Sequence, residues 1–127
     1  MSKKVLLVDD DPDFIQAVTV LLEAKDFIVV SASGGEEGFA KAQAEKPDLI
    51  SLDIMMEHDS KGFDISQKLK SDETTKNIPV IIVSGIKKAS NFAFDYETGE
   101  TLLPVKAILE KPINPEYFLK TVEQYIK

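Results

Sequence analysis

Five short apolar runs, separated by segments of helical period, constrain the fold more than any other feature of this sequence. Each run is too short for a buried helix, and several are rich in Val and Ile, which is typical of strands buried on both faces. The runs are Val5–Val8, Phe27–Val30, Leu49–Leu52, Val80–Val83 and Val105–Leu109. Strict alternation of strand and helix requires right-handed crossovers and a parallel sheet. We therefore predict a doubly wound α/β sandwich of three layers, with five parallel strands and five helices.

Capping residues and apolar stripes place the helices. Asp11 is a candidate N-cap, Pro12 suits the first helical position, and an apolar stripe that starts at Phe14 follows at helical spacing. Asn114 and Pro115 repeat this arrangement before the last helix. The three middle helices are predicted at Glu36–Glu45, Gly62–Lys70 and about Lys87–Tyr96. The last of these is rich in aromatic residues, which are weaker helix formers.

The composition excludes several classes of site and partner. The 127 residues suit one domain, and the absence of Cys excludes disulfides, thiolate zinc sites and iron–sulfur clusters. The single histidine, His58, excludes a His-rich metal site, and we expect it in a solvated loop. A net charge of −7 without any Arg argues against direct nucleic acid binding. No apolar stretch could span a bilayer and no signal peptide begins the chain, so we expect a cytoplasmic protein that binds no membrane.

Polar residues stand at the carboxyl ends of four predicted strands. They are Asp9 and Asp10 after the first strand, Asp53 after the third, Ser84 after the fourth and Lys111 after the fifth. In a doubly wound sheet of strand order 2-1-3-4-5, ligands bind beyond the carboxyl ends, where the order reverses between strands one and three. We therefore expect the three aspartates to converge at this edge of the sheet.

Three converging carboxylates need a cation, because they otherwise repel one another and at least one pKa rises. Their all-oxygen character favours Mg²⁺ over Ca²⁺, which requires more protein ligands. Together with the ammonium of Lys111 and the hydroxyl of Ser84, the cluster suits a phosphoryl group. Asp53 could then attack phosphorus and form an aspartyl phosphate, since a carboxylate is already ionised and needs no general base.

The ordered set of motifs resembles the receiver domain of bacterial two-component response regulators, over essentially the full length of the chain. The matches are Val8-Asp9-Asp10, Asp53 with Met56, Gly62-Phe63, Pro79, Ser84-Gly85 and Lys111-Pro112. The resemblance implies a flavodoxin-like fold of the CheY-like type and a phosphoryl group carried by Asp53. It implies that Asp10, Asp53 and the backbone carbonyl of Met55 bind Mg²⁺, with Mn²⁺ as a substitute, while Asp9 acts through water. Ser84 and Lys111 would contact the phosphoryl oxygens.

The same resemblance implies a signalling domain, not a turnover enzyme. Residues 1–127 would form a single receiver domain with no output domain within the chain. Its phosphodonor would be a phosphohistidine on a sensor histidine kinase or on a phosphotransfer protein. A downstream target protein would bind the face made by helix four, strand five and helix five, and the chain would be a monomer or a weak dimer.

The sequence departs from the family pattern at three places. Ile108 stands where the family usually has Tyr or Phe, three residues before the lysine. The segment from Ser84 to Lys111 is several residues longer than usual and carries Phe92, Phe94 and Tyr96. Met56-Glu57 replaces the usual Met-Pro. We therefore expect the target-binding face and the loop beside the site to differ most from the geometry that is usual in the family.

Three other functions share part of this pattern. Val5–Asp11 resembles the opening motif of haloacid-dehalogenase-like phosphatases, but Pro12-Asp13 replaces the expected Gly-Thr and the chain is short for that core. A pseudo-receiver would keep the fold as a binding module without phosphorylation. A flavodoxin-like cofactor carrier would need a phosphate loop rich in Ser, Thr or Gly after the first strand, which is missing.

Two side chains predict slow loss of the phosphoryl group. In receiver domains, the positions two beyond the phosphoacceptor and two beyond the hydroxyl residue flank the phosphoryl group, and here they are Met55 and Ile86. Neither can hydrogen-bond an attacking water, so we expect slower self-dephosphorylation than in relatives with amide or carboxylate groups there. The double variant Met55→Asn, Ile86→Glu should lose its phosphoryl group faster, as followed by intact mass. An unchanged decay would contradict this prediction.

Overall fold

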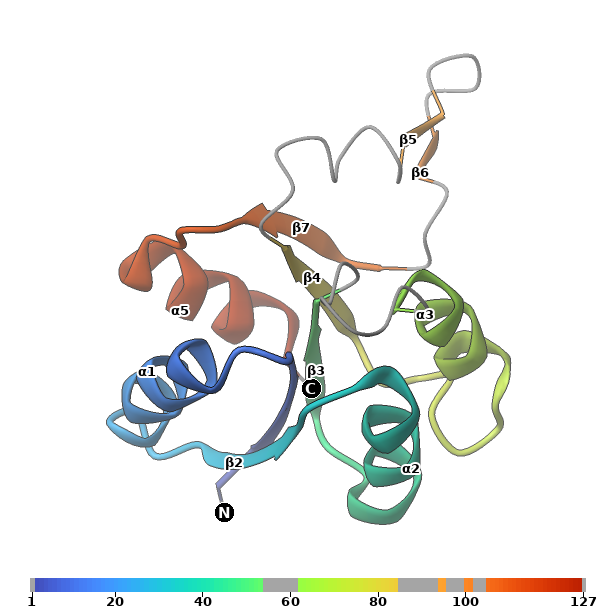
Figure 1. The fold of residues 1–127 in the computed structure, drawn as a ribbon, viewed down its shortest axis with the longest axis horizontal. Coiled ribbons are helices and arrows are strands. Elements are labelled where there is room, and N and C mark those ends of the chain that lie inside the picture. Colours follow the sequence, from blue (N-terminus) through green and yellow to red (C-terminus); the bar gives the residue numbers. More distant parts are fainter. Residues whose placement is uncertain (1, 54–61, 85–93, 96–99, 102–104, 127) are drawn as a thin grey trace.

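A five-stranded parallel sheet of order β2-β1-β3-β4-β7 forms the centre of the molecule, as predicted (Figure 1). The computed structural model describes residues 2–53, 62–84, 94–95, 100–101 and 105–126. The strands of this sheet are β1 (Lys4–Val8), β2 (Ile28–Ala32), β3 (Leu49–Leu52), β4 (Val80–Ser84) and β7 (Ala107–Glu110). They coincide with the five apolar runs to within about two residues. β1 lies in the interior of the sheet, where Val5 is in register with Val29 on one side and Leu49 on the other.

Two pairs of helices cover the two faces of the sheet. The helices of the described residues are α1 (Pro12–Glu23), α2 (Gly35–Glu45), α3 (Gly62–Ser71) and α5 (Pro115–Tyr125). α1 and α5 lie on one side and α2 and α3 on the other (Figure 1). Leu22 and Phe118 pack with Leu7 in the first core, whereas Ala42 and Leu69 pack in the second. No helix of the described residues is long and apolar enough to cross a membrane.

The helix starts confirm the predicted caps. The carboxylate of Asp11 accepts hydrogen bonds from the backbone N–H groups of Asp13 and Phe14, and Pro12 is the first residue of α1. The side chain of Asn114 accepts from the N–H of Tyr117 in the same way, with Pro115 at the start of α5. Both proline residues occupy positions where a helix has no use for an N–H, so the local sequence fixes both starts.

The prediction of a helix at about Lys87–Tyr96 is wrong in the part that the structure describes. Phe94–Asp95 form a short strand, β5, which pairs antiparallel with β6 (Glu100–Thr101). Aromatic side chains favour strands, which agrees with strand pairing at Phe94. The other residues of the predicted helix lie outside the described part of the chain.

α2 makes a close approach to β1 at Gly38. A Cβ placed on Gly38 would lie 2.7 and 2.9 Å from the two methyl carbons of Val8. Both methyls of a β-branched side chain are blocked at once, so no rotation of Val8 would relieve the contact. Because Val8 directly precedes Asp9, the packing of α2 bears on the residue next to the aspartate cluster.

Gly38→Ala should therefore lower the free energy of unfolding by about 1 kcal/mol, although Ala is the better helix former. Overpacking of roughly 2 kcal/mol outweighs a propensity gain of about 1 kcal/mol. Urea denaturation measures the change, and Ala40→Gly at an exposed position of α2 gives the propensity effect alone. In a Val8→Ala background the same Gly38→Ala change should no longer destabilise. A rise in stability on Gly38→Ala alone would refute the steric argument.

Candidate functional site

The register of β1 and β3 brings the three aspartates together. Val8 is the register partner of Leu52, and the N–H of Asp53 donates to the carbonyl of Val8 at 2.9 Å. Each strand therefore ends beside the other and delivers its next residue to the same edge of the sheet. Carboxylate oxygens of Asp9, Asp10 and Asp53 lie within 4.8 Å of one another. The convergence expected from the strand order is confirmed, whereas the roles of the three residues stay predictions.

Asp9 is the most buried member of this cluster. Its residue is 3% exposed, Oδ1 accepts a hydrogen bond from the N–H of Asp11 at 2.9 Å, and Oδ2 accepts from Nζ of Lys111 at 2.7 Å. Burial raises the pKa of Asp9 above its ordinary value; its hydrogen bonds and the charge of Lys111 oppose this rise, and the charge of Asp53 adds to it. Both oxygens of Asp9 are thus engaged within the chain.

Lys111 reaches the cluster from the carboxyl end of β7. Its Nζ lies 2.7 Å from Oδ2 of Asp9 and 3.4 Å from Oδ2 of Asp53, and its side chain is 19% exposed. Burial alone would lower the pKa of Lys111, but the hydrogen bonds to the two aspartates and their charges outweigh it and raise the pKa above the ordinary value. The ammonium therefore stays charged at neutral pH. The peptide bond from Lys111 to Pro112 is cis.

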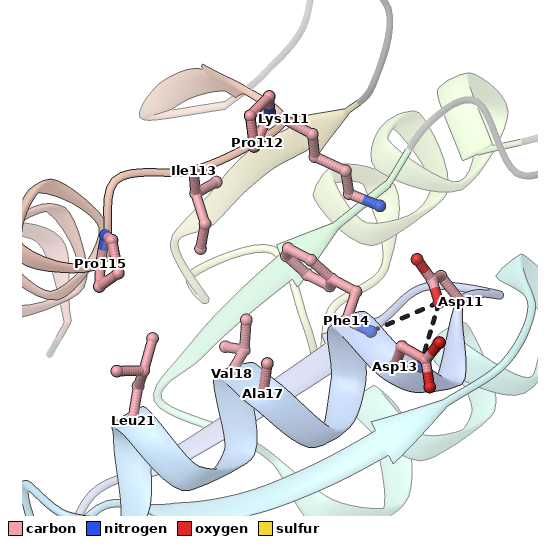
Figure 2. A pocket seen from close by; sticks show the side chains of 10 residues that line it. All are labelled: Asp11, Asp13, Phe14, Ala17, Val18, Leu21, Lys111, Pro112, Ile113 and Pro115. Carbon is pink, nitrogen blue, oxygen red and sulfur yellow. Dashed lines mark hydrogen bonds between the residues drawn. The ribbon is translucent and has the colours of Figure 1, made fainter.

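The aromatic ring of Phe14 lies against the same ammonium. Nζ of Lys111 is 4.2 Å from the ring centroid, which is the range of a cation–π contact. Phe14 also lines a cavity of about 540 Å³ between α1 and the segment after β7, where Ile113 and Pro115 face Leu21 (Figure 2). Sequence reasoning placed Phe14 on the apolar stripe of α1 and missed this contact. Its only signal was the position of an aromatic residue in the first turn after the aspartates.

The cluster fits a divalent cation by its donor chemistry. Three carboxylate groups against one ammonium give a formal charge of −2, which one divalent ion would balance. Hard carboxylate oxygens are the ligands that Mg²⁺ prefers, and Asp9, Asp10 and Asp53 are the described residues that could supply them. Asp9 and Asp10 also line a second cavity, of about 410 Å³, between the start of α1 and the end of β2, so the cluster can be reached from outside.

The remaining predicted site residues lie at the margin of what the structure describes. Ser84 ends β4, with Glu110 as its register partner, so its backbone lies at the same sheet edge as Lys111. The side chain of Ser84 lies outside the description, as do Met55, His58 and Ile86. Ile108, which replaces the usual aromatic residue, is half-buried and packs against the core on the α2 and α3 side.

Replacing Lys111 by Met should lower the free energy of unfolding of the metal-free protein by about 2 kcal/mol at neutral pH, since two buried carboxylates lose their partner. Lys111 has a raised pKa in the folded state. The stability that its pairing contributes is therefore complete below about pH 10.5, the ordinary pKa of lysine, and is lost as the pH rises through the higher pKa of the folded state. It should also shrink as the pH falls through the raised pKa of Asp9, whose carboxylate then loses its charge. Urea denaturation across this range tests both trends.

The matched control for this experiment is Lys120→Met. Lys120 is an exposed residue of α5, so the same exchange there should change stability by less than about 0.5 kcal/mol. Equal losses in the two variants would show that the pairing of Lys111 with the aspartates contributes no net stability.

The chain matches known proteins over nearly its whole length. It matches the response regulator receiver domain over residues 5–123. It is 34% identical to protein PilH of Pseudomonas aeruginosa over 119 residues, which cover 94% of this chain and 93% of PilH. It is 31% identical to the DNA-binding dual master transcriptional regulator RpaA of Synechocystis, covering 98% of this chain and 49% of RpaA.

A comparison of structures agrees with the comparison of sequences. The fold resembles that of the chemotaxis protein CheY4 of Vibrio cholerae with a TM-score of 0.83 and 27% identity, over 99% of this chain and all of CheY4. The family match, the relatives and the fold thus agree with the aspartate cluster found at the carboxyl ends of the strands. The chain belongs to the response regulator receiver domains, the CheY-like signalling domains of two-component systems.

Proposed function

We propose that this chain is a Mg²⁺-dependent phosphoacceptor, in which a phosphoryl group moves from a phosphohistidine to Asp53. The observation that carries the proposal is the position of Asp53. Its residue is 5% exposed, it follows a fully buried strand, and it lies between two further aspartates and a lysine. Burying a carboxylate costs free energy that an apolar residue at this position would not cost, which supports a chemical role for Asp53.

The transfer itself is a displacement at phosphorus. A carboxylate oxygen of Asp53 attacks, the new O–P bond forms, and the P–N bond to the imidazole of the donor breaks, so that the imidazole leaves with the electron pair of that bond. Mg²⁺ held by the aspartates would neutralise charge on the phosphoryl oxygens. Lys111, whose raised pKa keeps it protonated, would donate a hydrogen bond to one of these oxygens.

The partners follow from the chemistry of a phosphohistidine donor. A sensor histidine kinase or a phosphotransfer protein would supply the phosphoryl group, and a target protein would read the phosphorylated state. We propose that the target binds the face that includes β7 and α5. Lys111 directly follows β7 and so lies beside this face. The predicted fourth helix of that face lies largely outside the described residues, so β7 and α5 are the parts on which substitutions can be designed.

The direct test is the intact mass of the chain after incubation with Mg²⁺ and acetyl phosphate. We expect one added phosphoryl group on the wild type, none on Asp53→Asn, and none in EDTA. Asp26→Asn is the matched control, because Asp26 is exposed and has a positive φ of 67° that Asn tolerates equally well. This control should be phosphorylated like the wild type.

Three outcomes would contradict the proposal. An adduct that survives in Asp53→Asn would place the phosphoryl group elsewhere. No adduct, under conditions that label another receiver domain, would favour a binding module that is not phosphorylated. Steady turnover of a phosphate ester that Asp9→Asn abolishes and Asp53→Asn does not would instead indicate a phosphatase.

A further inference from the structure

We propose that Phe14 is a positioning residue for Lys111: its ring holds the ammonium over Asp9 and Asp53 and thereby sets the rate at which Asp53 is phosphorylated. The proposal rests on the proposed function of Asp53. It assigns a role in the site to a residue of α1 whose side chain carries no charge and no hydrogen-bonding group.

The ammonium of Lys111 has three protons, and among the described residues three groups that attract a cation lie near it. Asp9 lies at 2.7 Å, Asp53 at a longer 3.4 Å, and the centroid of the Phe14 ring at 4.2 Å. The face of an aromatic ring carries negative potential and attracts a cation, most strongly where water is excluded. Figure 2 shows the end of the Lys111 side chain extending past the ring of Phe14 toward the start of α1.

The start of α1 fixes the ring in place relative to the aspartates. The N–H of Asp11 donates to Oδ1 of Asp9 at 2.9 Å, and the carboxylate of Asp11 accepts from the N–H of Phe14 at 3.4 Å. One short stretch of chain therefore orients both the carboxylate that pairs with Lys111 and the ring that supports it. A shift of the helix start would move both partners of the lysine together.

A ring has an advantage over a hydrogen-bonding neighbour at this position. Lysine has a long, flexible side chain, so a free ammonium samples many positions in water. An aromatic face restrains it without accepting a directed hydrogen bond. The ammonium can then turn a proton from Asp9 toward a phosphoryl oxygen on Asp53 and stay against the ring. An aliphatic side chain of similar size would exclude water equally well but would not attract the charge.

This difference defines the variants. Phe14→Leu removes the ring and keeps an apolar side chain. Phe14→Tyr keeps an aromatic face and should behave like the wild type. Phe27→Leu is the matched control, because Phe27 is also half-buried and packs against the same core as Phe14. Phe27 precedes β2 and so lies at the opposite end of the parallel sheet from the site.

Two measurements are made on each full-length variant. The first is the NMR shift of the Lys111 Cε methylene, assigned by its absence in Lys111→Met; a methylene next to an ammonium above a ring is shifted upfield. The second is the rate of phosphorylation by acetyl phosphate at saturating Mg²⁺, followed by intact mass.

We expect the upfield shift in the wild type, Phe14→Tyr and Phe27→Leu, and its loss in Phe14→Leu. The rate should fall about fivefold in Phe14→Leu only. A wild-type methylene at the position of ordinary lysines would overturn the proposal, as would a wild-type rate in Phe14→Leu, or an equal fall in Phe14→Tyr or Phe27→Leu. If the wild type forms no adduct at all, the proposed function fails. The NMR comparison then decides by itself whether the ring holds the lysine.

Discussion

The pairing of Lys111 with Asp9 and Asp53 is the interaction on which the rest of the site depends. The sheet places three carboxylates at one edge, two of them nearly inaccessible to water, and such an arrangement is unfavourable without a positive charge. The ammonium provides that charge from a strand on the far side of β4. Because Lys111 follows the edge strand β7 and the aspartates follow the inner strands β1 and β3, their contact also links the last part of the chain to its first half across β4.

Backbone hydrogen bonds, a helix cap and close helix packing support this long-range contact. β1 and β3 are neighbours in register, so Asp9 and Asp53 are fixed by backbone hydrogen bonds before any side chain is considered. Asp11 then caps α1 and holds Asp9 at the same time. On the other face, Gly38 allows α2 to approach Val8, so both layers of helices bear on the residues that carry the cluster. The geometry of the site is thus a property of the whole sandwich.

The sequence predicted the features that follow from local rules. Buried runs predicted the strands, the Asp11-Pro12 and Asn114-Pro115 pairs predicted two helix starts, and the strand order predicted the meeting of Asp9 with Asp53. Phe94 and Asp95 were predicted in a helix because the alternating α/β pattern requires one between the last two strands, whereas they form a short strand, which an aromatic residue favours. The contact of Phe14 with Lys111 could not be predicted. Periodicity predicts which face of a helix is buried, but not which side chain from a distant part of the chain contacts that face.

The double engagement of Asp9 has a consequence for metal binding. Both of its oxygens already accept hydrogen bonds, one from the backbone of Asp11 and one from Lys111. An ion that coordinated Asp9 directly would share an oxygen with one of these donors, whereas a water molecule on the ion could be bound with less rearrangement. Lys111 is in this sense a resident counter-ion. The affinity of this site for a divalent cation would then depend on the nearby charge of Lys111 as well as on the ion–carboxylate bonds.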